Sequence, residues 1–157
     1  MVQSHNWKWL PAISAEEFAE HIEEESFPVQ YGNPVRIYTG DVVFSHGGLA
    51  DAFVRRYIPG RSYNDVDTVL QIINSFGCGE MWQDASSIWY RPQYYGGELY
   101  QSDTLLQVVG HTPVEKITRE GNLISCDVFS TDRDRKPIGT QEYLIIDTLT
   151  WAHQGIR

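Results

Sequence analysis

The sequence is poor in cysteine. Among its 157 residues there are two, Cys78 and Cys126, and they form no C-x-x-C motif. Two isolated thiols cannot build a disulfide framework, so we expect a protein of the reducing cytoplasm with both thiols packed in the interior. Cys126 lies within an apolar run with no histidine assigned beside it, and a role as a nucleophile is therefore not expected.

Positive charge and long apolar runs are also scarce. Twelve Lys and Arg stand against 21 Asp and Glu, for a net charge of -9. This balance argues against a nucleic-acid surface or an anionic-membrane surface, which need clustered basic residues, and leaves only a local basic pocket for a phosphate. No stretch approaches the roughly eighteen apolar residues of a transmembrane helix, and the N-terminus has no signal-peptide pattern.

What the sequence does contain is typical of a globular protein. Hydrophobic residues make up 41% and aromatic residues 13% of the chain, so disorder is not expected. We expect one domain, residues 1–157, with a helical segment at 1–34, a core at 35–147 and a tail at 148–157. Within the first segment, the capping-box pattern Ser14-Ala15-Glu16-Glu17 predicts a helix to about Glu25.

Hydrophobic periodicity predicts an α/β fold with mixed sheets flanked by helices. The expected helices cover residues 49–58 and 65–76, the second capped by Asn64. The expected strands are 35–39, 42–45, 105–109, 114–117, 123–129 and 142–146, with a tight turn at Gly40-Asp41. An aromatic loop at 81–97 carries Trp82, Trp89, Tyr94 and Tyr95, which we expect to cover the core rather than to stack on a base or sugar.

Two of these strands end in histidine. The strand at 42–45 leads into His46-Gly47-Gly48, and the strand at 105–109 leads into Gly110-His111. A neutral imidazole is a common metal ligand, ligands collect at strand ends in α/β sheets, and an adjacent glycine lets another group approach closely. The alternative, which spacing alone favours, is that both histidines are structural and donate hydrogen bonds to carbonyls.

Four short motifs add to this pattern. In order along the chain they are Phe44–Leu49 (FSHGGL), Ile88–Arg91 (IWYR), Val108–Pro113 (VVGHTP) and Ser125–Asp127 (SCD). Together they resemble the late motifs of the calcineurin-like metallophosphoesterases, of the serine/threonine-phosphatase or dinucleoside-polyphosphatase type. The resemblance covers about residues 35–146 and implies the C-terminal half of that family's αββα sandwich.

The resemblance implies roles for four residues. His46 and His111 would bind one of two bridged divalent metal ions (Mn, Fe, Zn or similar), and Arg91 would contact the phosphate of a phosphoester substrate. Asp127 would be a supporting residue close to the site and not a ligand. The implied reaction is phosphoester hydrolysis, a hydrolase activity, by a metal-bound hydroxide.

The family's early motifs are missing. D-x-H, G-D-x-x-D-R and G-N-H-D/E would supply the remaining ligands and the general acid; Gly40-Asp41 lacks the second Asp and the Arg, and Gly32-Asn33-Pro34 has Pro in place of His. Two imidazoles are half of a tetrahedral shell. We therefore expect the chain to be inactive alone.

Two alternatives follow from the missing half. One is a non-catalytic binding or oligomerisation module that pairs through an exposed sheet, as a homo-oligomer or with a missing N-terminal half, because half a sandwich leaves sheet edges and an apolar face uncovered. The other is complementation, in which a separate polypeptide supplies the missing ligands.

Overall fold

The computed structural model describes the backbone of residues 35–39 and 42–157, and side chains from Val42 onward. These residues belong to one compact unit, Pro34–Arg157. The helix predicted from the capping box and the turn at Gly40-Asp41 lie outside the described residues. Within the described part of the chain, no helix is long and apolar enough to cross a membrane.

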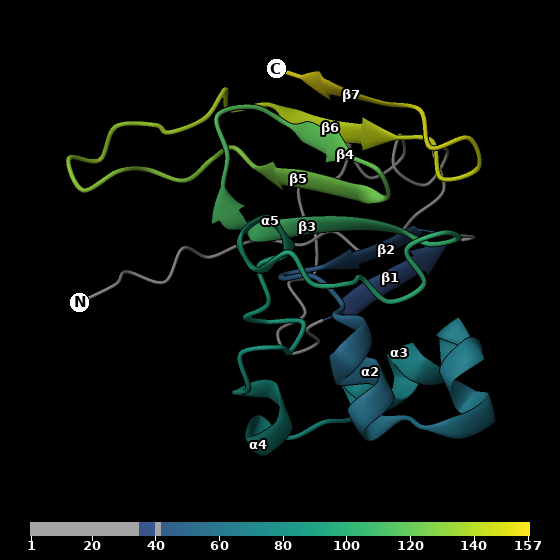
Figure 1. Ribbon diagram of the computed structural model, residues 1–157. Coiled ribbons are helices and arrows are strands. Elements are labelled where there is room, and N and C mark those ends of the chain that lie inside the picture. The colour runs from purple at the N-terminus through teal and green to yellow at the C-terminus, as the bar shows by residue number, and fades with distance from the viewer. Residues whose placement is uncertain (1–34, 40–41) are drawn as a thin grey trace, which may run out of the picture. The chain divides into compact units, whose positions relative to one another are not determined.

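A five-stranded mixed sheet forms the centre of this unit (Figure 1). Its order is β1 (Val35–Thr39), β2 (Val42–Ser45), β3 (Leu106–Pro113), β5 (Leu123–Asp127) and β4 (Thr118–Glu120). The three inner strands β2, β3 and β5 are parallel, whereas β1 and β4 are antiparallel edge strands. Helices connect β2 to β3, so the predicted α/β class with a mixed sheet is confirmed.

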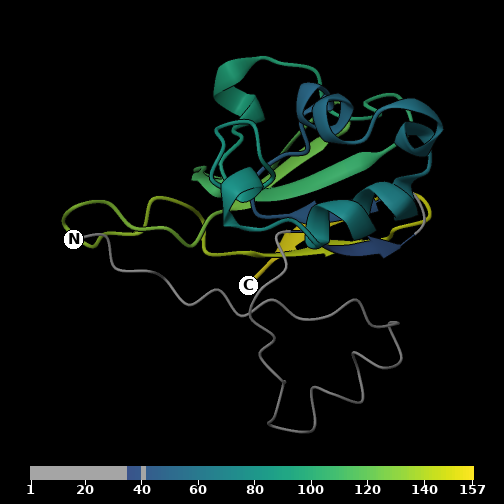
Figure 2. The same ribbon diagram turned by 90° about the horizontal axis from the view of Figure 1, so that it is seen from below.

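The connection from β2 to β3 lies on one side of the sheet (Figures 1 and 2). It contains α2 (Asp51–Tyr57), a 3-10 helix (Gly60–Asn64), α3 (Val66–Asn74), α4 (Cys78–Met81) and α5 (Pro92–Tyr95). The short helices α4 and α5 lie at the two ends of the predicted aromatic loop. A parallel pair such as β2–β3 requires a crossover of this kind.

Helix α3 shows why this layer packs. Val69, Leu70 and Ile73 recur at helical spacing and are buried in the core cluster between helices and sheet, as the periodicity predicts. The predicted cap Asn64 is wrong. Asp65 is the N-cap residue, and its carboxylate accepts hydrogen bonds from the backbone N–H and the hydroxyl of Thr68.

A two-stranded antiparallel sheet, β6 (Tyr143–Ile146) and β7 (His153–Ile156), covers the opposite face (Figure 1). The second apolar cluster joins Leu144, Ile146 and Trp151 to side chains of β2, β3 and β5. The tail expected at 148–157 is therefore wrong in part, because it contains β7. The sequence of β7 is polar and contains a glycine, so it gives little strand signal. Its pairing with β6 follows a turn in which the Asp147 carboxylate accepts hydrogen bonds from the backbone N–H groups of Leu149 and Thr150.

The hairpin before β5 also differs from the prediction. The strand expected at 114–117 is wrong, and β4 begins at Thr118. The Val114 N–H donates to the carbonyl of Asp127 at the end of β5, so the chain turns there. It returns to antiparallel pairing only at Thr118, after which Gly121 makes the turn with a φ of 58°.

Candidate metal and phosphate site

His46 follows β2 directly and lies beside the end of β3. The two parallel strands pair Ser45 with Val109, and the Gly110 N–H donates to the His46 carbonyl at 3.1 Å. Thus His46 is level with Gly110, one residue before His111. In a regular strand, side chains alternate between faces, and His111 would therefore point away from His46.

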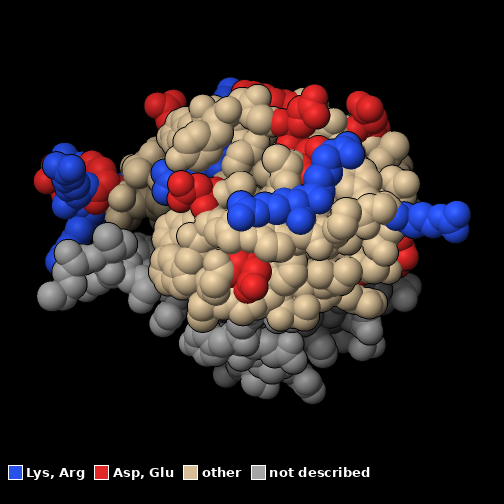
Figure 3. Space-filling view, turned by 60° about the horizontal axis from the view of Figure 1, so that its bottom comes forward, with Lys and Arg blue, Asp and Glu red and all other residues tan. Residues whose placement is uncertain are grey.

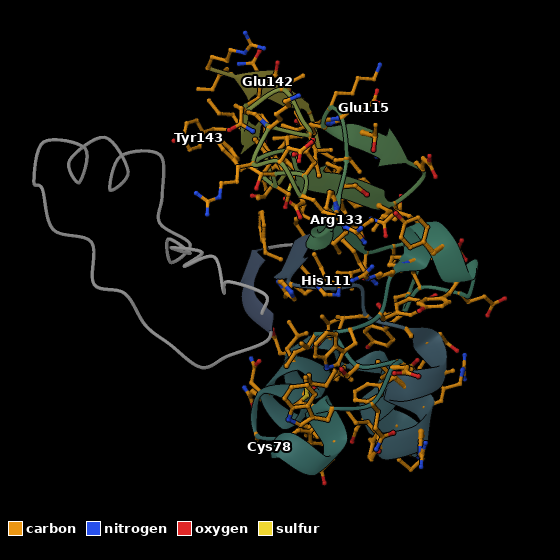
Figure 4. All side chains as sticks on the ribbon, turned by 90° about the vertical axis from the view of Figure 1, so that its left-hand side faces the viewer. Cys78, His111, Glu115, Arg133, Glu142 and Tyr143 are labelled. Atoms are coloured by element: carbon orange, nitrogen blue, oxygen red, sulfur yellow. The ribbon has the colours of Figure 1, made fainter. Side chains whose placement is uncertain are left out.

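An irregular backbone brings the two histidines together. His111 has a φ of 56°, in the left-handed region, and the pairing of β3 with β5 shifts between Val109 and Pro113. The imidazole rings of His46 and His111 consequently lie 4.5 Å apart between centroids, at 58° to each other. A left-handed conformation at a non-glycine residue is costly and is concentrated at functional sites. Figure 4 shows His111 between the helices and the upper strands.

Gly47 and Gly48 bring Arg91 to the same place. The Gly47 N–H donates to the Ser87 carbonyl at 2.6 Å and the Gly48 N–H to the Tyr90 carbonyl at 3.0 Å. A Cβ on Gly47 would lie 2.6 Å from the Tyr90 oxygen, so no larger residue fits here. Arg91 comes next in the chain and acts electrostatically on both histidines.

Asp127, the last residue of β5, is the fourth member of this group. It is buried and accepts hydrogen bonds from the Ser130 hydroxyl at 2.9 and 3.0 Å, and its charge reaches His46. The structure therefore brings together all four residues singled out from the sequence, His46, Arg91, His111 and Asp127. Their roles stay predictions.

Both imidazoles are held in the neutral form. Burial lowers the pKa of His46, opposed by Asp127 and assisted by Arg91. Burial, followed by the charges of His46 and Arg91, lowers the pKa of His111 to about 4. Because a metal binds the neutral imidazole, neither histidine has to lose a proton first at neutral pH.

The ring geometry fits two ligands of a single ion. With metal–nitrogen bonds of about 2.0–2.1 Å, two imidazoles on one metal have centroids about 4.5–5.5 Å apart. The buried His111 Nε2 has no hydrogen-bond partner, as a ligand atom would. The described residues hold no group of three or more His, Cys, Asp or Glu that could bind a metal, so no third ligand of these kinds accompanies the two histidines there.

Two further residues of this region were not predicted to be functional. Trp89 stands edge-on to His111 at 5.6 Å between centroids, and its buried Nε1 has no partner. Gln93 donates from Nε2 to the Ser125 hydroxyl at 2.6 Å, while its buried Oε1 accepts no hydrogen bond. Trp89 belongs to the motif Ile88–Arg91 (IWYR), which was the available signal; nothing in the sequence marked Gln93.

The cysteines and the exposed aromatics correct two expectations. Cys78 is exposed, not packed. Cys126 is half-buried, its thiol donates to the Val109 carbonyl at 3.2 Å, and desolvation raises its pKa to about 12, which disfavours the nucleophilic thiolate. Trp82, Tyr94 and Tyr95 are exposed and do not cover the core.

One face of the described unit carries surface charge of both signs. On the face shown in Figure 3, Lys and Arg are interspersed with Asp and Glu.

Comparison with known proteins adds no relative. The chain matches no family model, no curated protein and no solved structure.

Proposed function

We propose that this chain is a metallophosphoesterase-like protein in which His46 and His111 bind one divalent metal ion and Arg91 binds a phosphate. The observation that carries the proposal is the convergence of the two histidines, 4.5 Å apart, through the left-handed backbone at His111. A structural pair of histidines needs no such backbone, because each could donate to a carbonyl from a regular strand.

Each residue contributes a separate property. His46 and His111 offer neutral nitrogens on two neighbouring strands, and Arg91 offers a planar guanidinium suited to a tetrahedral oxyanion. The negative charge of Asp127 raises the pKa of His46, against the larger effect of burial. A bound metal would polarise a phosphoryl oxygen and lower the pKa of a bound water.

The same chain is proposed to be inactive by itself. The described residues offer two nitrogen ligands and no bridging carboxylate, whereas a two-metal hydrolase needs ligands for both ions. His46, Arg91, His111 and Asp127 do not supply the missing metal ligands. A complete metal site would need ligands from another part of the parent protein or from a second polypeptide.

Metal titration tests the first half of the proposal. Mn²⁺ or Zn²⁺ added to the metal-free full chain in a calorimeter should bind at one equivalent. His46→Asn or His111→Asn should weaken binding at least about tenfold, as expected for loss of a ligand, whereas His153→Asn on β7 should not. Absent binding by the unaltered chain, or equal binding by all three variants, would overturn the site.

An assay with p-nitrophenyl phosphate and Mn²⁺ tests the second half. We expect negligible turnover by the chain alone. Turnover that His111→Ala abolishes would show that the ligand set is complete and that the inactivity was misjudged.

A second candidate function is a non-catalytic module that pairs through its exposed sheet. The outer face of β6 and β7 favours it: Tyr143, Ile145 and Ile156 are exposed there, and Leu149 in the connecting turn is 89% exposed. Leu144 and Ile146 pack inward instead, so β6 is apolar on both faces, which is typical of a covered strand.

Size-exclusion chromatography and sedimentation separate the candidates. A pairing module should self-associate or bind a partner, and Ile145→Lys should disrupt the association while leaving metal binding intact. A monomer with full secondary structure at all concentrations would exclude self-pairing.

A further inference from the structure

An exposed aromatic residue lies on the chain segment that leads to Arg91. Trp82, just after α4, is 68% exposed. One side of its indole contacts Trp89, at 5.3 Å between centroids and 30° between planes. A tryptophan packed only on one side keeps an open ring surface that is suited to stacking.

A continuous series of rings connects Trp82 to the histidines. Trp89 lies 5.6 Å from His111, and Trp82 lies 5.3 Å from Trp89, which places Trp82 within about 11 Å of His111. This is within the reach of one small ligand that has a phosphate at one end and a ring at the other. The segment that holds both tryptophans also carries Arg91.

Two unpartnered polar atoms lie along this series. The N–H of Trp89 is buried and has no acceptor, and the buried Nε2 of His111 has no partner either. Buried polar groups are nearly always satisfied, and an exception indicates a missing ligand, ion or water. A ligand oxygen beside Trp89 would accept from this N–H.

We propose that the site binds a phosphate ester whose organic part is a planar aromatic ring, and that Trp82 stacks on that ring. The inference rests on the proposed phosphate site at Arg91 and adds the class of substrate. The ring belongs to a nucleobase or to an aryl alcohol, since either has the flat face that the indole would contact. Stacking of a base on an aromatic side chain is strong enough to change affinity about tenfold or more.

Calorimetry of the full chain in Mn²⁺ with three phosphate monoesters tests this proposal. The ligands are AMP, phenyl phosphate and glycerol 2-phosphate, which share the phosphate and differ in the organic part. AMP or phenyl phosphate should bind at least about tenfold tighter than glycerol 2-phosphate. The tighter of the two identifies the source of the ring, and either order supports the proposal.

Variants locate the contact. Trp82→Ala should bring aromatic and aliphatic ligands to the same affinity, and Trp82→Phe should keep part of the difference. Tyr143→Ala is the matched control, because Tyr143 is also an exposed aromatic residue but lies away from His111 (Figure 4). Circular dichroism checks that each variant is folded.

The outcomes separate this inference from the proposed function. If all three ligands bind equally and Arg91→Ala abolishes binding, the phosphate site stands and the aromatic preference is overturned. If an aromatic preference survives Trp82→Ala, the stacking role of Trp82 is overturned. If none of the three ligands binds, both proposals fail.

Discussion

His111 combines an unfavourable backbone conformation with an unfavourable environment for charge. Its φ of 56° places it where asparagine is the most tolerant replacement among non-glycine residues. Burial, His46 and Arg91 lower its pKa from 6.5 to about 4. The unfolded chain therefore binds a proton at this residue between about pH 6.5 and pH 4, while the folded chain does not.

The shift predicts a pH dependence of stability. Because the unfolded state binds more protons in this window, the free energy of unfolding falls as pH drops from about 6.5 to about 4. The contribution of His111 is about 1–2 kcal/mol after allowance for its half-exposed position. Urea unfolding at several pH values, compared with His111→Asn, measures it. An equal slope in both proteins would contradict the assigned pKa.

Gly47 is required by contact and not by its own conformation. Gly47→Ala would place a Cβ 2.6 Å from the Tyr90 carbonyl oxygen and 3.1 Å from that of Ser87. We expect a loss of about 2–4 kcal/mol in the free energy of unfolding, together with weaker phosphate binding as Arg91 moves.

Gly79 provides the matched control. It lies in α4, and a Cβ there meets nothing within 4 Å. Gly79→Ala should leave stability unchanged or raise it by up to about 1 kcal/mol, since alanine favours helix. Thermal unfolding of both variants makes the comparison, and equal losses would mean that contact with the Ser87–Tyr90 backbone is not the cause.

Among the elements, β3 is joined to the two ends of the helical connection, at Leu49 and Tyr100, through one buried side chain. Gln107 is 0% exposed and exchanges two hydrogen bonds with Leu49, accepting from its N–H at 2.8 Å and donating to its carbonyl at 3.2 Å. It also donates to the Tyr100 carbonyl at 3.2 Å. These bonds fix the chain just after His46-Gly47-Gly48.

Gln107→Leu tests this connection. The leucine fits the volume but removes the hydrogen bonds of Gln107 to the Leu49 N–H and the Tyr100 carbonyl, and we expect a loss of about 2–4 kcal/mol. Gln154→Leu on β7, an exposed position, should change stability by less than about 0.5 kcal/mol. Urea denaturation measures both. A small effect at Gln107 would mean that water replaces the amide.

The elements that the sequence predicted correctly are those with strong local patterns. Apolar runs identified β2, β3 and β5, and helical spacing identified α2 and α3. What was missed depends on partners: β7 has no apolar pattern of its own and exists through pairing with β6.

The same distinction applies to the site. Motifs singled out His46, Arg91, His111 and Asp127, but periodicity alone would place the two histidines on opposite faces. Only the shift in register after Val109 brings them together. Gln93 gave no signal, because its contact with Ser125 joins residues that are 32 positions apart.

On the scale of the described unit, three layers succeed one another: helices, the five-stranded sheet and the β6–β7 sheet. The candidate site lies where β2 and β3 end and the helical connection returns. The connection leaves and re-enters the sheet at one place, since Ala50 forms a bridge with Leu99 and the Tyr100 N–H donates to the Leu49 carbonyl at 2.8 Å.

Because these contacts hold its two ends together, the whole helical connection behaves as one closed loop. Length changes far from these contacts add little entropy cost, because closing a longer loop costs only about 0.6 kcal/mol per doubling. A short glycine-serine insertion before Gly60, the exposed first residue of the 3-10 helix, should therefore leave metal and phosphate binding unchanged. The same insertion after Gly48 should abolish both. Over evolutionary time, such an architecture lets descendants lengthen the exposed turns between Asp51 and Glu98, provided that the buried helix faces and the segment that returns Arg91 are kept, while the paired histidines keep their positions.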